Sequence, residues 1–130
     1  MCLEIVATIS PKATGRISAA RLSEICGLKV SSWKFEGASC LRFSVSGGCS
    51  CEFLSDDAEF ESEYWVLDTS HLQQLAKAVG ALYDECRRFS FVARWLNGER
   101  ERRSEKISAK ALAKLVTENR IGNNVLYVVG

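Results

Sequence analysis

Residues 68–88 read DTSHLQQLAKAVGALYDECRR, and this stretch decides the fold that we expect for the chain. Apolar side chains recur in it at steps of three and four residues, at Leu72, Leu75, Ala76, Val79, Leu82, Tyr83 and Cys86. Such spacing places them on one face of a helix of about four to five turns. Residues 68–70 offer an N-cap, and Arg87 and Arg88 follow at the negative end of the helix dipole. A helix that is apolar along one face must cover another layer, so the remaining chain has to supply a sheet.

The predicted strands are stretches in which β-branched residues dominate or apolar residues alternate with polar ones. They cover residues 3–9, 28–35, 40–46, 89–96 and 125–129. Two further helices are predicted over 17–26 and 108–119, with Ser18 as the N-cap of the first and Gly27 as its left-handed end. Residues 36–39 form a hairpin-like turn. Residues 64–67 form either a short strand or an extended lead-in to the long helix.

These elements follow the order β-α-β-β-α-β-α-β, and the first six match the split β-α-β arrangement of ferredoxin-like folds. We therefore expect an α+β protein, a ferredoxin-like two-layer sandwich in which three helices cover one face of a mostly antiparallel sheet. The length suits a single domain over residues 1–130. Within it, residues 3–35 and 89–129 read as an internal β-α-β repeat, because Ile17-Ser18-Ala19 recurs as Ile107-Ser108-Ala109.

Composition and charge exclude several classes of protein. A net charge of +1 gives no global attraction to nucleic acid or to a membrane surface. No apolar run approaches the roughly 20 residues that a membrane span needs. The opening Met-Cys-Leu-Glu-Ile-Val lacks the basic and long apolar parts of a signal peptide. We therefore expect a cytoplasmic protein whose six cysteines are reduced thiols.

The strongest candidate site lies in SVSGGCSCEFL, residues 44–54. Gly47 and Gly48 suit a turn or a close backbone approach. If residues 49–51 run extended, the sulfurs of Cys49 and Cys51 lie on the same side of the strand. That geometry suits one soft metal ion, Zn²⁺ or Cu(I), a redox pair, or two thiols in the core. A metal ion needs further ligands, which Cys40 or Cys2 can supply from neighbouring strands.

Other residues suggest weaker sites. His71, the only histidine, is the one candidate base for a cysteine nucleophile, and no hydrolase, nucleotide or zinc-protease motif is present. Basic residues gather late in the chain, next to Trp95: Arg94, Arg100, Arg102 and Arg103. Glu99, Glu101 and Glu105 cancel much of this charge, so nucleic-acid binding is disfavoured against a mixed-charge loop. The acidic segment 56–63 is a suitable ionic partner for that loop, within one chain or across a dimer.

These observations predict a small binding or assembly domain without catalytic machinery, a homodimer through its sheet, with an unknown protein or small molecule as partner. The aromatic residues Trp33, Phe35 and Trp95 either belong to the core, which we favour, or form a patch on the uncovered face of the sheet. The alternative function is thiol-dependent metal binding or redox chemistry at Cys49 and Cys51. Apart from such a metal ion, no cofactor is predicted.

Overall fold

Six strands form one sheet in the order β2-β3-β1-β4-β6-β5 in the computed structural model of the chain, which describes residues 2–13, 15–55, 62–96 and 100–130. The strands are β1 (Leu3–Ile9), β2 (Lys29–Phe35), β3 (Ala38–Ser44), β4 (Phe89–Trp95), β5 (Arg103–Ile107) and β6 (Val125–Val129). The helices are α1 (Ala19–Cys26), α2 (Leu72–Cys86) and α3 (Ala109–Thr117). Two short 3-10 helices, η1 (Ser50–Phe53) and η2 (Thr69–His71), lie between β3 and α2 in the sequence. Only β5 and β6 pair in parallel, so the sheet is mixed.

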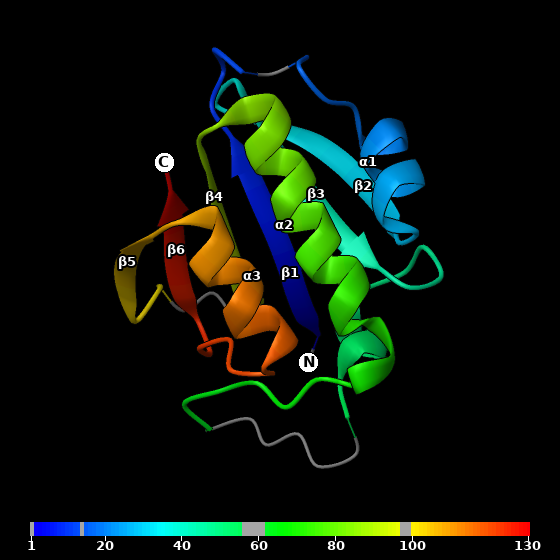
Figure 1. The fold of residues 1–130 in the computed structure, drawn as a ribbon, viewed down its shortest axis with the longest axis vertical. Coiled ribbons are helices and arrows are strands. Elements are labelled where there is room, and N and C mark those ends of the chain that lie inside the picture. Colours follow the sequence, from blue (N-terminus) through cyan, green and yellow to red (C-terminus); the bar gives the residue numbers. More distant parts are fainter. Residues whose placement is uncertain (1, 14, 56–61, 97–99) are drawn as a thin grey trace.

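The three helices lie on one face of the sheet, and α2 crosses its centre over β1 (Figure 1). The alternation along β1 explains this layering: Leu3, Ile5, Ala7 and Ile9 belong to the large core beneath the helices. The intervening residues face the other way, as the pleat of a strand requires. This arrangement confirms the predicted α+β architecture with three helices over one face.

The predicted face of α2 is confirmed in most positions. Its buried residues are Leu72, Leu75, Ala78, Val79, Ala81, Leu82 and Cys86. Tyr83 is exposed instead, with its ring beneath the guanidinium of Arg87. Two large aromatics complete the core under α2 and α3, where Trp65 meets Trp95 with ring centroids 4.7 Å apart. The indole N–H of Trp65 donates to the carbonyl of Ala93 at 2.7 Å, so its polar atom is satisfied in the core.

The predicted cap of α1 forms, whereas the N-cap predicted within residues 68–70 does not cap α2. Asp68 accepts from the amide of Ser70 and caps η2 instead, and His71, which precedes α2, makes no side-chain cap bond. Ser18 caps α1 by accepting from the amide of Arg21, and Ser108 caps α3 by accepting from the amide of Ala111, both at 3.1 Å. Gly27 ends α1 with a φ of 79°, a left-handed conformation that glycine adopts at little cost. The two caps are equivalent in the proposed repeat, which otherwise stays a prediction.

The element order differs from the expected one, because residues 103–107 form the strand β5 and not a charged loop. The observed order is β-α-β-β-α-β-β-α-β. β5 lies at the edge of the sheet, where only β6 flanks it, and its residues Arg103–Lys106 are exposed. Charged side chains are well tolerated on an edge strand, and there they also oppose further pairing. The charged residues of 103–107 therefore led to the prediction of a loop where the chain forms a strand. With this added strand, the order expected for a ferredoxin-like fold does not describe the whole sheet.

Two further segments depart from regular strands. Residues 50–53 form η1, so the alternative in which residues 49–51 run extended is wrong. Residues 64–67 are an extended lead-in, tied by isolated bridges between Leu54 and Leu67 and between Tyr64 and Gly122. The acidic residues Asp56, Asp57, Glu59 and Glu61, and residues 97–99 at the start of the predicted charged loop, lie outside the described residues.

The sheet face opposite the helices carries a small apolar cluster of Val6, Cys40 and Val92. Trp33 shares this face, because it pairs across the strands with Cys40, and Phe35 follows two residues later. Trp33 is 39% exposed and Phe35 65% exposed, whereas Trp95 is buried. The aromatic prediction is therefore right for Trp95 and wrong for the two aromatics of β2. No helix in the described part of the chain is both long and apolar enough to cross a membrane.

Candidate metal centre

Three cysteine sulfurs converge at one end of β1. The Sγ atoms of Cys2, Cys49 and Cys51 all lie within 4.8 Å of one another. Cys2 precedes β1 directly, Cys49 precedes η1, and Cys51 lies inside it. All three are free thiols; Cys2 is exposed and the other two are partly buried. The sulfurs of Cys49 and Cys51 therefore lie close together at a 3-10 helix, where the sequence also allowed an extended strand.

The site exists because β1 is only half paired on its β3 side. The β1–β3 ladder covers Val6–Ile9 and leaves the amides of Leu3 and Ile5 without a strand partner there. η1 fills this place: the amide of Ile5 donates to Oγ of Ser50 at 3.0 Å, and the amide of Leu3 donates to Sγ of Cys51 at 3.1 Å. The amides of Leu3 and Ile5 on β1 therefore hold η1 beside the start of the strand.

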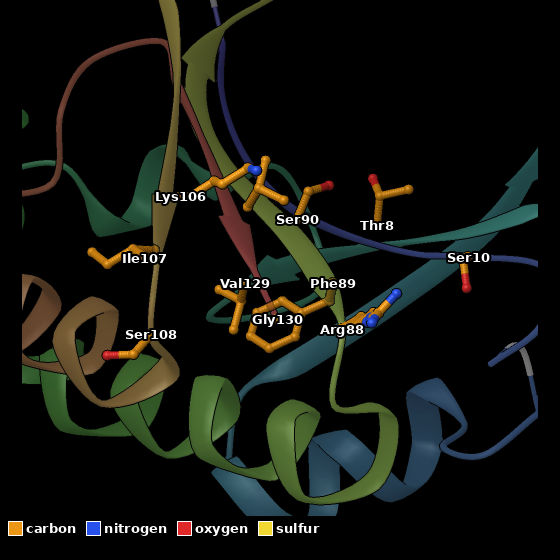
Figure 2. Close-up of a pocket in the computed structure, with 11 residues that line it drawn as sticks. Thr8, Ser10, Arg88, Phe89, Ser90, Lys106, Ile107, Ser108, Val129 and Gly130 are labelled. Atoms are coloured by element: carbon orange, nitrogen blue, oxygen red, sulfur yellow. The ribbon is translucent and has the colours of Figure 1, made fainter.

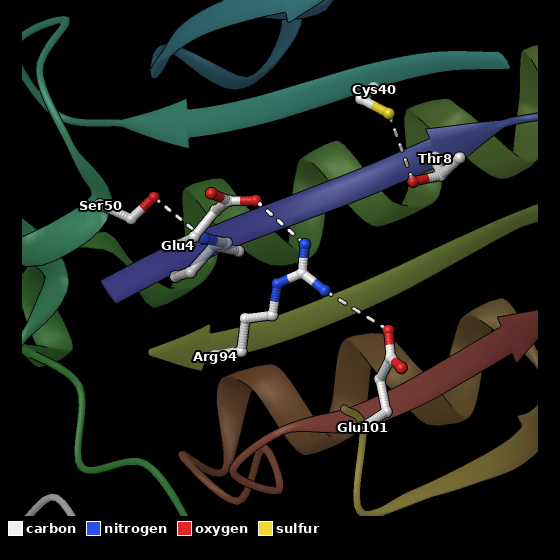
Figure 3. A network of polar contacts seen from close by, with 7 residues as sticks. Glu4, Thr8, Cys40, Ser50, Arg94 and Glu101 are labelled. Carbon is white, nitrogen blue, oxygen red and sulfur yellow. Dashed lines mark hydrogen bonds and ion pairs between the residues drawn. The ribbon is translucent and has the colours of Figure 1, made fainter. Parts of the chain in front are cut away.

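Ser50, between the two cysteines, is the anchor of η1. Its side chain is completely buried, and its hydroxyl also donates to the carbonyl of Phe43 on β3. Phe53, at the end of η1, is likewise completely buried. Figure 3 shows Ser50 reaching β1 from the segment that follows β3. Because both contacts fix the backbone, the thiols on either side of Ser50 hold a defined position.

The turn before η1 is fixed as well. Gly47 has a φ of 105°, which a residue with a Cβ adopts at a cost, so glycine suits this position. The hydroxyl of Ser46 donates to both carboxylate oxygens of Glu52, at 2.8 and 2.9 Å, and its amide donates to one of them at 3.1 Å. The third cysteine is also held by its backbone: the carbonyl of Cys2 accepts from the amide of Leu96 at 2.8 Å. Of the two predicted glycines, Gly47 is the one whose backbone conformation favours glycine in this turn.

The thiols have different acidities. Hydrogen bonds from the Cys51 side chain and then from its amide lower the pKa of Cys49, and the Cys2 thiol contributes in the same direction. Burial, followed by the hydrogen bond to Cys49, raises the pKa of Cys51 to about 11. Cys49 therefore loses its proton before Cys51, and its thiolate accepts hydrogen bonds from the Cys51 and Cys2 side chains. The thiolate is the form of cysteine that binds metals and acts as a nucleophile.

Three sulfur donors in one cluster suit a soft metal ion. Thiolates favour Cu(I) and Zn²⁺ over hard ions such as Mg²⁺ or Ca²⁺. A structural zinc site normally has four protein ligands, and the group of described residues contains three. His71 does not join them: its Nδ1 lies 2.8 Å from Oε1 of Gln74, and its ring stands edge-on to Phe53. The pairing of His71 with Cys49 or Cys51 stays a prediction.

The other candidate residues lie elsewhere. Cys40 is on the opposite face of the sheet, where the hydroxyl of Thr8 donates to its sulfur at 3.9 Å (Figure 3). Cys2, the alternative to Cys40, supplies the third sulfur. Cys26 and Cys86 are buried in the core as expected, and burial raises the pKa of both.

Three of the predicted basic residues, Arg94, Arg102 and Arg103, take part in ion pairs in the described part of the chain. Arg94 bridges Glu4 and Glu101, with N–O distances of 3.4 Å to each (Figure 3). Arg102 pairs with Glu63 at 3.7 Å, which is one ion pair between the acidic segment and the basic one. Arg103 pairs with Glu105, and the carbonyl of Arg100 accepts from the side-chain amide of Asn124. These are mixed-charge contacts, as the alternation of signs predicts.

Sequence reasoning missed Ser50, which decides the geometry of the site. Its signal is weak, because a serine between two cysteines reads as a polar spacer. When the chain is compared with protein-family models, curated proteins and solved structures, none of them matches. Functional conclusions must therefore come from the geometry of the chain itself.

Proposed function

We propose that this protein binds one Cu(I) ion through the thiolates of Cys2, Cys49 and Cys51. The observation that carries the proposal is the convergence of three sulfurs within 4.8 Å at a point held by Ser50 and the β1 backbone. Cu(I) is well served by three thiolates, whereas Zn²⁺ would need a fourth ligand from water or a partner. The exposed Cys2 leaves the site accessible, which suits a protein that takes up and releases its ion.

The acidities of the thiols support the same role. Cys49 supplies a thiolate at low cost, and the ion then displaces the protons of Cys2 and Cys51. Such a site requires a reducing compartment, since oxidation would join two of the sulfurs. We therefore keep the cytoplasm as the proposed location.

A competition titration tests the proposal. The reduced protein competes for Cu(I) against the coloured chelator bathocuproine disulfonate without oxygen, with Zn²⁺ titrated separately. We expect one Cu(I) per chain, and a loss of at least about 100-fold in affinity for the double variant Cys49→Ser/Cys51→Ser. The matched control is Cys40→Ala, a buried cysteine on the other face. Equal Cu(I) binding by the double variant, or tight binding of Zn²⁺ alone, would contradict the proposal.

A second candidate function is assembly through the sheet, as a homodimer. It is favoured by Trp33 and Phe35, which are exposed on β2, an edge strand with β3 on one side only. An unpaired edge strand with exposed aromatics is suited to pairing with the same strand of a second copy. Light scattering after size exclusion tests this. A dimer that Phe35→Ser converts to a monomer supports it, and a wild-type monomer at high concentration rejects it.

A ferredoxin-like unit is proposed only for the first six elements, β1 to β4. It is supported by the pairing of β1 with both β3 and β4 and of β2 with β3, a split β-α-β arrangement. In this view β5, α3 and β6 extend the unit. Cross-strand NOEs that join Val6 to both Arg42 and Val92 are expected, and their absence would exclude the arrangement.

A further inference from the structure

The structure contains a second feature suited to ligand binding, a cleft of about 770 Å³ at the opposite end of β1 from the cysteines. It lies where β1 ends and β4 begins, beside the ends of β5 and β6 (Figure 2). Its volume falls within the usual range for small-molecule sites, about 300–1,000 Å³. The cleft shares no residue with the thiol cluster, so it is independent of the proposed copper site.

Two cations line this cleft without a counter-charge from a lining side chain. They are Arg88, just before β4, and Lys106 on β5, and no aspartate or glutamate is among the lining residues. In the described part of the chain neither of them takes part in an ion pair, whereas Arg94, Arg102 and Arg103 all do. Figure 2 shows Lys106 extending towards Ser90 and Arg88 extending towards Ser10, so the two charges lie on different sides of the cleft.

Polar groups suited to an anion accompany the cations. Ser108 lines the cleft as the N-cap of α3; its oxygen accepts from the amide of Ala111, which leaves its proton available to a ligand. The hydroxyl of Thr8 has only the long contact of 3.9 Å to the sulfur of Cys40. Hydroxyl donors and two cations around one space match the several acceptor oxygens of a phosphate group.

The floor of the cleft is apolar. It is formed by Val128, which is 38% exposed on the same face of the sheet as Lys106, its register partner on β5. Phe89 and Val129 alternate with these residues and are buried in the core beneath the helices. An inorganic anion binds through its charge and gains nothing from an apolar surface. An organic ligand gains free energy of binding by burying its apolar part there. The backbone of Gly130 closes the cleft against Arg88: a Cβ at position 130 would come within 2.7 Å of Cγ of Arg88.

We propose that this cleft binds a small phosphomonoester with a flat apolar body, its phosphate held between Arg88 and Lys106 and its body against the exposed side chain of Val128. The two cations set the charge of the ligand, and the floor distinguishes an organic phosphate from the free ion. A Gly130→Val variant should place a side chain against the stem of Arg88 and obstruct the site.

Calorimetric titration of the full chain with phenyl phosphate tests the proposal. We expect saturable binding at one site, and losses of about tenfold in affinity for Arg88→Gln and for Lys106→Gln. Inorganic phosphate, which lacks the body, should bind at least about tenfold more weakly, and phenol should not bind. Lys110→Gln, an exposed lysine at the start of α3 outside the cleft, is the matched control and should leave the affinity unchanged.

The outcomes separate a site from a surface effect. Arg88 and Lys106 are exposed, so both variants should keep the melting temperature of the wild type. Gly130→Val provides a second line of evidence that removes no charge. Absence of phenyl phosphate binding, equal affinity for inorganic phosphate, or affinity unchanged by all three cleft variants would overturn the proposal.

Discussion

The amide of Ile5 on β1 donates to the hydroxyl oxygen of Ser50 at 3.0 Å, and through this bond a short 3-10 helix takes the place of a strand beside β1. The same hydroxyl donates to the carbonyl of Phe43 on β3. One completely buried side chain therefore links two strands to the segment that carries Cys49 and Cys51. The position of the thiol cluster depends on this link.

Replacement of Ser50 by alanine should disturb both stability and the cluster. The variant leaves the amide of Ile5 and the carbonyl of Phe43 without their partner in a buried place. We expect a loss of about 1–3 kcal/mol in the free energy of unfolding, measured with urea. Cu(I) affinity should fall as well, although every sulfur remains. Ser31→Ala, at an exposed serine of β2, is the control, and an equal loss in both variants would contradict the role of Ser50.

Alkylation of the thiols should follow a fixed order as the pH rises. The lowered pKa of Cys49 makes it the first of the pair to react with iodoacetamide, and Cys51, with a pKa of about 11, should react only in strong alkali. Mass spectrometry of peptides after short exposures at a series of pH values measures this. Reaction of Cys51 before Cys49 would be inconsistent with the hydrogen bonds described.

The same pKa shifts predict how stability depends on pH. The folded protein holds the proton of Cys51 more tightly than the unfolded chain, whose thiol has the ordinary value of 9.0. Its contribution to stability is therefore complete below pH 9 and is lost as the pH rises towards 11. Cys49 acts in the opposite sense, because its lowered pKa adds stability above the ordinary value and loses it as the pH falls. Cys51→Ala should flatten the alkaline part of the unfolding profile, and an unchanged profile would refute the assignment.

The helix α2 offers a direct comparison of a core position with its neighbour. Leu82 is completely buried, whereas Tyr83, the next residue, is on the exposed side. Leu82→Ala should cost about 2–5 kcal/mol of unfolding free energy, because it removes apolar contacts and leaves a cavity. Tyr83→Ala should cost less than about 1 kcal/mol. Similar losses at the two positions would mean that the helix is rotated from the position described.

Arg94 should contribute more to the free energy of unfolding than its partly exposed position suggests, because its ion-pair partner Glu4 is buried. Glu4 is only 6% exposed, and its carboxylate lies 3.4 Å from Arg94 on the uncovered face of the sheet. Arg94→Met leaves this carboxylate without its cation and should cost about 1–3 kcal/mol, a value reduced by the partial exposure of Arg94. The exposed pair of Arg102 and Glu63 serves as the comparison, and Arg102→Met should cost less than about 0.5 kcal/mol. Equal costs would show that burial of Glu4 is unimportant.

Much of the fold was predictable because local patterns decided it. β1 and β6 form where alternation or β-branched residues predict them. Ser18 caps α1 through its side chain, and Gly27 ends α1 because glycine adopts a left-handed φ at little cost. β5 was not predictable from charge and polarity, because its pairing with β6 is a tertiary contact at an exposed edge. Edge strands lack the apolar alternation on which sequence patterns depend.

The sequence indicated that cysteine sulfurs would form the candidate site, but it did not predict the backbone conformation that brings them together. The spacing of Cys49 and Cys51 indicated that two sulfurs could meet, and Cys40 was predicted with them, with Cys2 as the alternative third sulfur. The choice depends on the register of β1 and β3, which places Cys40 opposite Thr8 and on the wrong face. Register arises from side chains far apart in the sequence, so the spacing of the cysteines could not reveal it.

X-ray absorption at the copper edge of the Cu(I)-loaded protein tests the central claim most directly. Three bound sulfur atoms and no nitrogen or oxygen ligand are expected in the wild type, with fewer sulfurs in Cys2→Ser and an unchanged spectrum in Cys40→Ala. A first shell of nitrogen or oxygen in the wild type, or an unchanged set of sulfurs in Cys2→Ser, would contradict a copper site built from Cys2, Cys49 and Cys51.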